Sequence, residues 1–208
     1  LRKSLGKADD VARDWAAELR KLLRRMLGVS ASVRESNTDI IPYSVFAQSI
    51  PPGAAVCVLR TEDGALGFMM MSPSFTTYVL NRRLGGSAQQ QPSVSEDVRT
   101  FLSAVDRRIV RPFCEEVVAA LISTWGKDEV SVAISEVLAR PIDLPKLAQF
   151  EPLLRLPLSV SLGLESNEEL CVVLTGTAIK MPKIEEKAPE PVRSSDRGRM
   201  AARLALAE

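Results

Sequence analysis

The sequence predicts an α/β (α+β) domain built from two related halves, with a β-sheet core flanked by long helices. Three observations lead to this prediction. The 208 residues are 46% hydrophobic and 25% charged, which is typical of a soluble globular domain. Stretches with helical spacing of apolar residues alternate with stretches of strand-like alternation. The order long helix, strand, short helix and two-stranded hairpin occurs twice, the second copy beginning roughly 100 residues after the first.

The elements of the first half follow from spacing and from turn residues. A helix is predicted over 10–27, because Val11, Trp15 and Leu19 recur at steps of three and four and Gly28 ends the pattern. A strand over 29–33 and a short helix within "PYSVFAQSIPPG" come next. "AAVCVLR" and "ALGFMMM" predict a hairpin around "TEDG". A helix follows in "SPSFTTYVLNRRL", with Ser72 as its cap and Pro73 in its first turn.

The second half repeats this order without a final helix. Ser93 and Glu96 form a capping box that opens a long helix reaching Trp125, and Pro112 should kink it. "EVSVAISEV" predicts a strand and "LPKLAQF" a short helix or turn. "LRLPLSVSLGL" and "LCVVLTGTAI" predict a hairpin around "ESNEE". We expect the apolar sheet faces of the two halves to be buried jointly, with the helices outside.

The domain boundaries follow from composition. Residues 1–9 are expected to be an N-terminal tail, and 10–180 the domain, with halves of about 10–86 and 93–180. Residues 181–208 are Pro-rich and charged, so they are expected to be a linker. The chain starts at Leu1 without methionine and ends in "AARLALAE", so we interpret it as a fragment that leads toward a missing domain.

Composition argues against several classes of site. Histidine is absent, which removes the commonest general base and metal ligand. Cys57, Cys114 and Cys171 are scattered and are expected to be buried reduced thiols, and no CxxC pair predicts zinc. The net charge of +1 does not favour nucleic acid, and no apolar run approaches ~18 residues. No catalytic residue, cofactor or metal site is predicted.

The candidate interaction site is the Gly-Gly bend at the end of the helix in "SPSFTTYVLNRRL". Gly85 fits a helix C-cap, whereas Gly86 is harder to explain by capping and leaves the backbone bare for a partner. A phosphate cradle is excluded, because its glycines would have to precede a helix. Arg82 and Arg83 are explained either by acidic residues on a partner or by favourable placement at a helix C-terminus.

Three stretches resemble, in order, the middle domain of the bacterial flagellar motor switch protein FliM family. They are "YSVFAQSIPPGAAVCVLR", "ALGFMMMSPSFTTYVLNRRLGG" and "LAQFEPLLRLPLSVSLGL". The family's short helix, its turn into the next helix and its Gly-Gly terminus are matched by residues 43–51, 71–73 and 83–86. The resemblance covers about 10–179. The family loop is usually Gly-Gly-x-Gly, and Ala88 stands at its fourth position here.

The resemblance implies a CheC-like, pseudo-twofold domain without catalytic activity. It implies a structural subunit of the flagellar C-ring, cytoplasmic at the inner-membrane face of the basal body, which helps to set rotation direction in chemotaxis. FliG would bind at Arg82, Arg83, Gly85, Gly86 and Ser87, and neighbouring FliM copies would pack side by side. FliN would bind through the missing C-terminal domain, and phosphorylated CheY mainly through a missing N-terminal peptide.

Two alternative functions use the same fold. One is an SctQ-like scaffold of a type III secretion cytoplasmic ring. The other is a phosphatase of phosphorylated CheY. By analogy with CheC and CheX, such a phosphatase would need a Glu and an Asn three residues apart on a long helix. The three asparagines, Asn37, Asn81 and Asn167, are all predicted to lie off the long helices, so this alternative is disfavoured. A nucleic-acid role would depend on the basic residues of the first helix alone.

Overall fold

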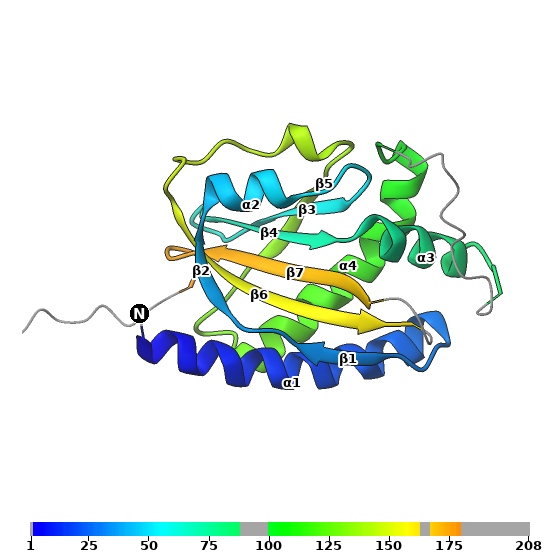
Figure 1. Ribbon diagram of the computed structural model, residues 1–208, viewed down its shortest axis with the longest axis horizontal. Coiled ribbons are helices and arrows are strands. Elements are labelled where there is room, and N and C mark those ends of the chain that lie inside the picture. Colours follow the sequence, from blue (N-terminus) through cyan, green and yellow to red (C-terminus); the bar gives the residue numbers. More distant parts are fainter. Residues whose placement is uncertain (1, 88–99, 163–166, 180–208) are drawn as a thin grey trace, which may run out of the picture.

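A computed structural model gives the fold and describes residues 2–87, 100–162 and 167–179 (Figure 1). In chain order the elements are α1 (Arg2–Leu27), β1 (Ser32–Glu35), β2 (Asp39–Pro42), α2 (Tyr43–Ser49), β3 (Ala55–Arg60), β4 (Leu66–Met71), α3 (Pro73–Arg83), α4 (Ala104–Trp125), β5 (Ala133–Val137), the 3₁₀ turn η1 (Pro141–Asp143), β6 (Pro152–Ser161) and β7 (Asn167–Thr175). Within these ranges, no helix combines the length and apolar character that crossing a bilayer requires.

The two halves share one sheet. The described strands form a seven-stranded sheet in the order β1-β6-β7-β4-β3-β5, with β2 also paired to β6, and all pairs are antiparallel. The expectation that two apolar sheet faces would pack on each other is therefore wrong. Each half contributes strands to a common sheet, because β4 and β7 pair edge to edge.

A pseudo-twofold axis relates the halves. Exchanging β1 with β5, β3 with β6 and β4 with β7 reverses the strand order and leaves the sheet unchanged. The register agrees, because β5 pairs with Cys57–Arg60 and β1 pairs with Leu158–Ser161, 101 residues further along at both ends (57 to 158, 60 to 161). With this offset Met70 and Cys171, which pair with each other, are equivalent positions. The predicted duplication is confirmed.

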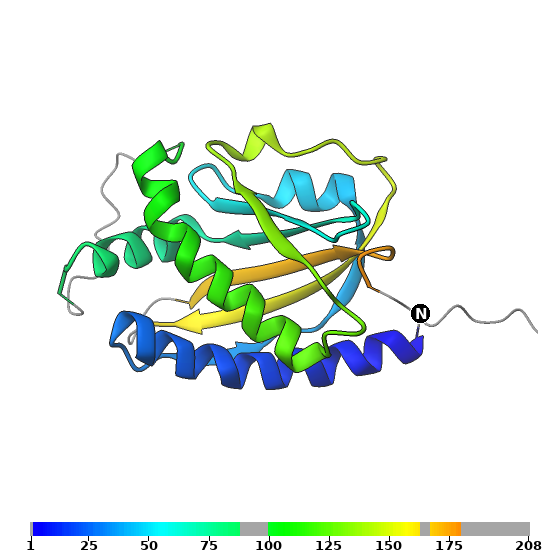
Figure 2. The same cartoon turned by 180° about the vertical axis from the view of Figure 1, so that it is seen from behind.

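The back face of the sheet, shown in Figure 2, is covered by the two long helices. There α4 crosses the sheet diagonally and α1 runs along the β1 edge. Trp15 of α1 is fully buried, and its indole Nε1 donates to the Val117 carbonyl of α4 at 3.2 Å. Phe75 of α3 meets Phe113 of α4 edge to face, with ring centroids 6.0 Å apart. This is the larger of the two core clusters.

The front face carries a second, smaller core, which is centred on the first half and also includes Leu153, Cys171 and Val173 of β6 and β7. Phe46 of α2 is 1% exposed and stacks on Phe68 of β4, with ring centroids 5.7 Å apart. Met70 belongs to this cluster, whereas Met69 and Met71 point into the back core, so all three methionines are buried. Their side chains alternate between the two faces of the sheet, as in any strand, and none forms a surface patch.

A proline explains why the outer strand beside β6 is broken into β1 and β2. Residues 36–38 interrupt it opposite Leu156 and Pro157. The Pro157 carbonyl accepts from the Ser36 amide at 3.0 Å, but proline has no N–H to return the bond. The second segment, β2, was not predicted from the sequence.

Several predicted boundaries need correction. The first helix begins at Arg2, so most of the expected tail 1–9 is helical. The long helix α4 begins at Ala104 and is capped by Ser103 and Asp106, a capping box of the kind predicted earlier in the chain. Ser93 and Glu96 lie outside the described residues.

The second half has one further departure. The strand predicted over 129–137 is divided, because Val130 forms an isolated bridge and β5 begins only at Ala133. For 144–150 a short helix or a turn was predicted, and the structure has the turn, with η1 just before the stretch. Pro141 and Pro145 remove backbone donors from this connection, which favours turns over a helix.

The three cysteines are free and buried, as expected. Cys57 and Cys114 lie in the back core, and Cys171 lies in the front core. Burial raises the pKa of the Cys114 and Cys171 thiols above their ordinary value, because a thiolate would lose its hydration there.

Candidate protein-interaction site

Helix α3 is anchored at its start. Ser72 is the N-cap, its Oγ accepting from the Phe75 amide, and it also donates to Glu168 of β7 at 2.7 Å. Pro73 occupies the first turn, as predicted. Phe75 and Val79 are fully buried against the back core. The helix is thus fixed, and its C-terminal end has a defined place.

The Gly-Gly bend is a Schellman terminus. The Gly86 amide donates to the Asn81 carbonyl at 2.8 Å, and the Gly85 amide donates to the Arg82 carbonyl at 3.2 Å. Gly85 has φ +90°, the left-handed conformation that favours glycine. A Cβ on Gly86 would lie 2.8 Å from the Asn81 carbonyl oxygen. Both glycines are therefore required by the helix end, and the interpretation that Gly86 exceeds capping needs is wrong.

Arg82 is held by the protein itself. Its Nε and Nη2 donate to the Leu27 carbonyl at the end of α1, at 2.9 and 2.5 Å, and its Nη1 donates to the Gly86 carbonyl at 2.6 Å. Tyr78, one turn earlier, is buried. Burial raises the pKa of its hydroxyl, and the nearby positive charge of Arg82 partly offsets this. Sequence reasoning missed the contact with α1.

The outer surface of the bend faces solvent. Arg83, Leu84, Gly85 and Ser87 are exposed, and the Leu84 side chain is 68% exposed although it is large and apolar. The C-terminal ends of α1 and α3 lie at the same end of the molecule in both views (Figures 1 and 2). Ala88, the predicted departure from the family loop, lies outside the described residues.

The geometry does not favour an anion site at the bend. The glycines follow α3 at the negative end of its dipole, where an anion is repelled. The described residues contain no group of three or more His, Cys, Asp or Glu that could hold a metal ion. Neither α1 nor α4 contains an asparagine, so the carboxamide expected of a CheC-type phosphatase site is absent from both helices.

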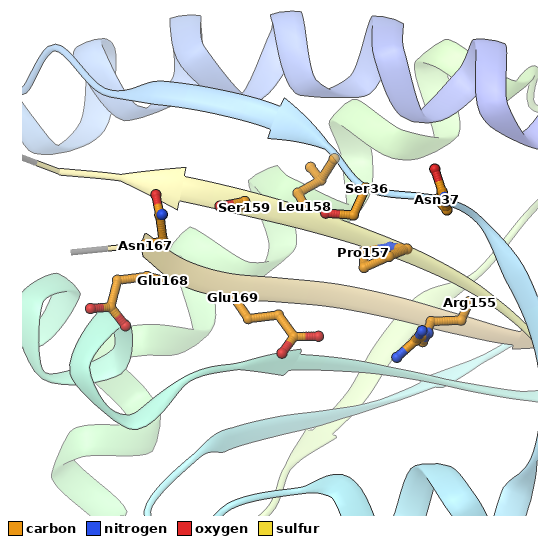
Figure 3. Close-up of a pocket in the computed structure, with 9 residues that line it drawn as sticks. All are labelled: Ser36, Asn37, Arg155, Pro157, Leu158, Ser159, Asn167, Glu168 and Glu169. Carbon is orange, nitrogen blue, oxygen red and sulfur yellow. The ribbon is translucent and has the colours of Figure 1, made fainter. Parts of the chain in front are cut away.

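A second surface feature, not predicted from the sequence, is a polar groove of about 450 Å³ on the front face of β6 and β7 (Figure 3). Arg155 lies at one end of it and pairs with Asp39 through two 2.8 Å hydrogen bonds. This pairing raises the pKa of the Arg155 guanidinium. Its other lining residues are Ser36, Asn37, Pro157, Leu158, Ser159, Asn167, Glu168 and Glu169.

The groove is the pseudo-twofold counterpart of the surface under α2. With the offset of 101 residues, Ser159 and Glu169 correspond to Val58 and Phe68, which α2 covers. Polar residues replace apolar ones, so this half of the front face needs no cover. Sequence comparison of the two halves at that offset would have found the difference.

Comparison with known proteins gives a consistent result. Residues 3–165 match the family model described as flagellar motor switch protein FliM. The chain is also similar to solved structures of the FliM middle domain from H. pylori and of the FliG–FliM complex from H. pylori. The first is 14% identical, with 84% of this chain and 92% of that one covered and a TM-score of 0.69. The second is 16% identical, with coverages of 84% and 94% and a TM-score of 0.69.

A third similar structure is the FliM middle domain from Vibrio alginolyticus. It is 12% identical, with 81% of this chain and 93% of that one covered and a TM-score of 0.63. At these identities the solved structures establish the likeness of the fold. No curated protein matches the chain.

Proposed function

The chain belongs to the flagellar motor switch protein FliM family, and we propose that it is a structural subunit of the motor's C-ring that binds FliG through the bend at the end of α3. The family match makes it a component of the flagellar motor switch. The finer assignment is supported by one observation above all. The bend is built rigidly by the helix end, yet its outer surface is exposed and carries Leu84 and Arg83.

The proposed FliG contact lies at the segment of Arg82, Arg83, Gly85, Gly86 and Ser87, to which the structure adds Leu84, with Arg82 bonded to carbonyls of this chain beneath the exposed residues. One of the similar solved structures is itself a complex of FliG with FliM, which supports FliG as the partner. An exposed leucine beside a bare backbone can serve as an apolar anchor, and Arg83 can pair with a carboxylate at its rim.

Titration with a FliG middle domain tests this assignment. A substitution of Gly86, such as Gly86→Trp, is a poor variant, because any Cβ there collides with the Asn81 carbonyl. Leu84→Asp and Arg83→Glu change exposed side chains instead, and each is expected to weaken binding by about tenfold or more. Arg20→Glu, an exposed charge reversal on α1, is the matched control and should bind normally. Wild-type affinity in both bend variants would refute the assignment.

We further propose that copies of the chain pack side by side in the ring, at the cytoplasmic face of the inner membrane, and help to control rotation direction in chemotaxis. Ile142 and Phe150, 83% and 82% exposed on the segment between β5 and β6, are candidate contacts between copies. Sedimentation velocity at rising concentration tests this, and a monomer at every concentration would count against it.

The binding of the remaining partners is likewise a proposal, and it concerns segments outside the described residues. We propose that the domain ends near residue 180 and that 181–208 link it to a FliN-binding domain, while phosphorylated CheY binds mainly through a peptide before the domain. The family match favours this flagellar role over a secretion-ring scaffold. We propose no enzymatic role. Phosphate release from phosphorylated CheY is expected to stay at the uncatalysed rate when the chain is added, and acceleration would contradict this.

A further inference from the structure

We propose that Arg82 is a positioning residue that fastens the bend to the C-terminal end of α1, so that the exposed face of the bend takes its shape from the place where α1 ends. The proposal deepens, and for its binding consequence rests on, the proposed contact with FliG. It assigns Arg82 a role different from that of its neighbour Arg83. Arg82 fixes the conformation of the bend, whereas Arg83 presents its side chain on the surface of the bend.

The end of α1 leaves a carbonyl that needs a donor. The last carbonyls of a helix have no partner within it, and Leu27 is the final residue of α1. Gly28 follows with φ +66°, which turns the chain away. Arg82 fills this need by donating from two nitrogens to the Leu27 carbonyl. A Cβ on Gly28 would lie 3.2 Å from Arg82 Nη2, so the glycine also leaves room for the guanidinium.

The same guanidinium reaches the bend. Its third nitrogen donates to the carbonyl of Gly86, whose amide closes the Schellman turn on Asn81. The planar fork of arginine can hold two carbonyls from different segments at once, which the ammonium of lysine does not do equally well. Both helices also direct the negative ends of their dipoles toward this charge. If the end of α1 moves, Arg82 must therefore either lose its hydrogen bond to the Gly86 carbonyl or move that carbonyl with it.

Each nitrogen of Arg82 thus donates to a carbonyl of this chain, and the residue is only partly exposed. A partner that paired with Arg82 would have to displace these bonds. Arg83 is exposed. The two adjacent arginines therefore predict different responses to substitution, and that difference makes the proposal testable.

Amide hydrogen exchange on the 208-residue chain without any partner gives the first test. Arg82→Ala is expected to speed exchange at the Gly86 amide by about tenfold, and Arg82→Lys by less, because one carbonyl stays satisfied. Arg83→Ala is the matched control, and its Gly86 exchange should equal that of the wild type. Thermal melts identify any variant that fails to fold, in which case Arg82→Lys carries the comparison.

A double-mutant cycle tests the link to α1. Gly28→Ala should speed Gly86 exchange in the wild-type chain by crowding Nη2, but should add little when Arg82 is already alanine. Non-additivity of this kind connects the residue that follows α1 with a residue of α3. Additive effects, or Gly86 exchange that Arg82→Ala does not change, would overturn the proposal.

Titration of the same variants with a FliG middle domain separates this proposal from the proposed function. Weaker binding that follows the exchange order, alanine beyond lysine, supports both. Loss of binding in Arg82→Ala with unchanged exchange would show a direct partner contact and overturn the positioning role. If the wild-type chain does not bind FliG, the proposed function fails, while the exchange results still decide whether Arg82 fastens the bend.

Discussion

The front face of the sheet is covered where α2 lies and open over the part of β6 and β7 around Ser159 and Glu169, although the two halves place their strands alike. Over the first half, α2 rests on Val58 and Phe68, both fully buried. At the equivalent positions of the second half stand Ser159 and Glu169, which line the polar groove of Figure 3. The backbone frame is duplicated, whereas the choice between covered and open follows from a few side chains.

The connections between strands show the same difference. The chain between β2 and β3 forms the short helix α2, whose Phe46 is buried. The chain between β5 and β6 holds the 3₁₀ turn η1 but no α-helix, and it leaves Ile142 and Phe150 on the surface. A duplicated fold can therefore free one copy's surface for contact while the other copy keeps its surface for stability.

The largest change in stability is expected when the residues at the equivalent positions Phe68 and Glu169 are each replaced by the other. Phe68→Glu places a charge in the buried front core and is expected to lower the free energy of unfolding by more than about 4 kcal/mol. Glu169→Phe, its counterpart, changes an open position and should stay within about 0.5 kcal/mol. Urea denaturation monitored by circular dichroism measures both. Similar losses in the two variants would show that the faces do not differ as described.

The α2 cover itself gives an effect of intermediate size. Phe46→Ala should cost about 3 kcal/mol, since it removes a buried ring stacked on Phe68. Phe150→Ala removes a ring that is 82% exposed and is the matched control, with an expected change within about 0.5 kcal/mol. Chemical denaturation of both variants checks this. Equal stability of the two would mean that α2 contributes little.

Much of the fold is predictable from the sequence because its signals are local. Ser72 and Pro73 mark the start of α3, and the spacing of Trp15 and Leu19 marks α1. The repeated element order gave the duplication, and the family resemblance pointed to the Gly-Gly bend. What failed were features set by distant partners. That β4 would pair with β7 in one sheet is encoded in no local pattern.

The candidate site shows the same limit. The glycine pair is visible in the sequence. That the second position also requires glycine is evident only from the distance between Gly86 and the Asn81 carbonyl. Arg82 and Arg83 look equivalent as letters, and only the carbonyl of Leu27, 55 residues away, separates their roles. The groove escaped notice because Ser159 and Glu169 are ordinary residues until the halves are aligned by register.

The smallest expected difference is in the rates at which buried thiols of the two cores react with a labelling reagent. Cys171 lies under α2 and Cys57 under the long helices. In single-cysteine variants the front core should open more readily, so Cys171 is expected to react with a disulfide reagent about tenfold faster than Cys57. Reaction rates followed by absorbance at constant pH give the comparison. Slower labelling of Cys171 would indicate that the short helix closes its core as firmly as the long ones do.

The strand pair β4–β7, where Met70 and Cys171 meet on the pseudo-twofold axis, gives the molecule a seam of backbone hydrogen bonds in place of a hinge. Neither half has an interior of its own, since the helices at its back pack against strands from both. If one half unfolded, the other half would expose both an unpaired strand edge and the apolar face of a helix. The domain should consequently unfold in a single thermal transition, and a torque applied at the tip of α3 would turn the whole body as one piece.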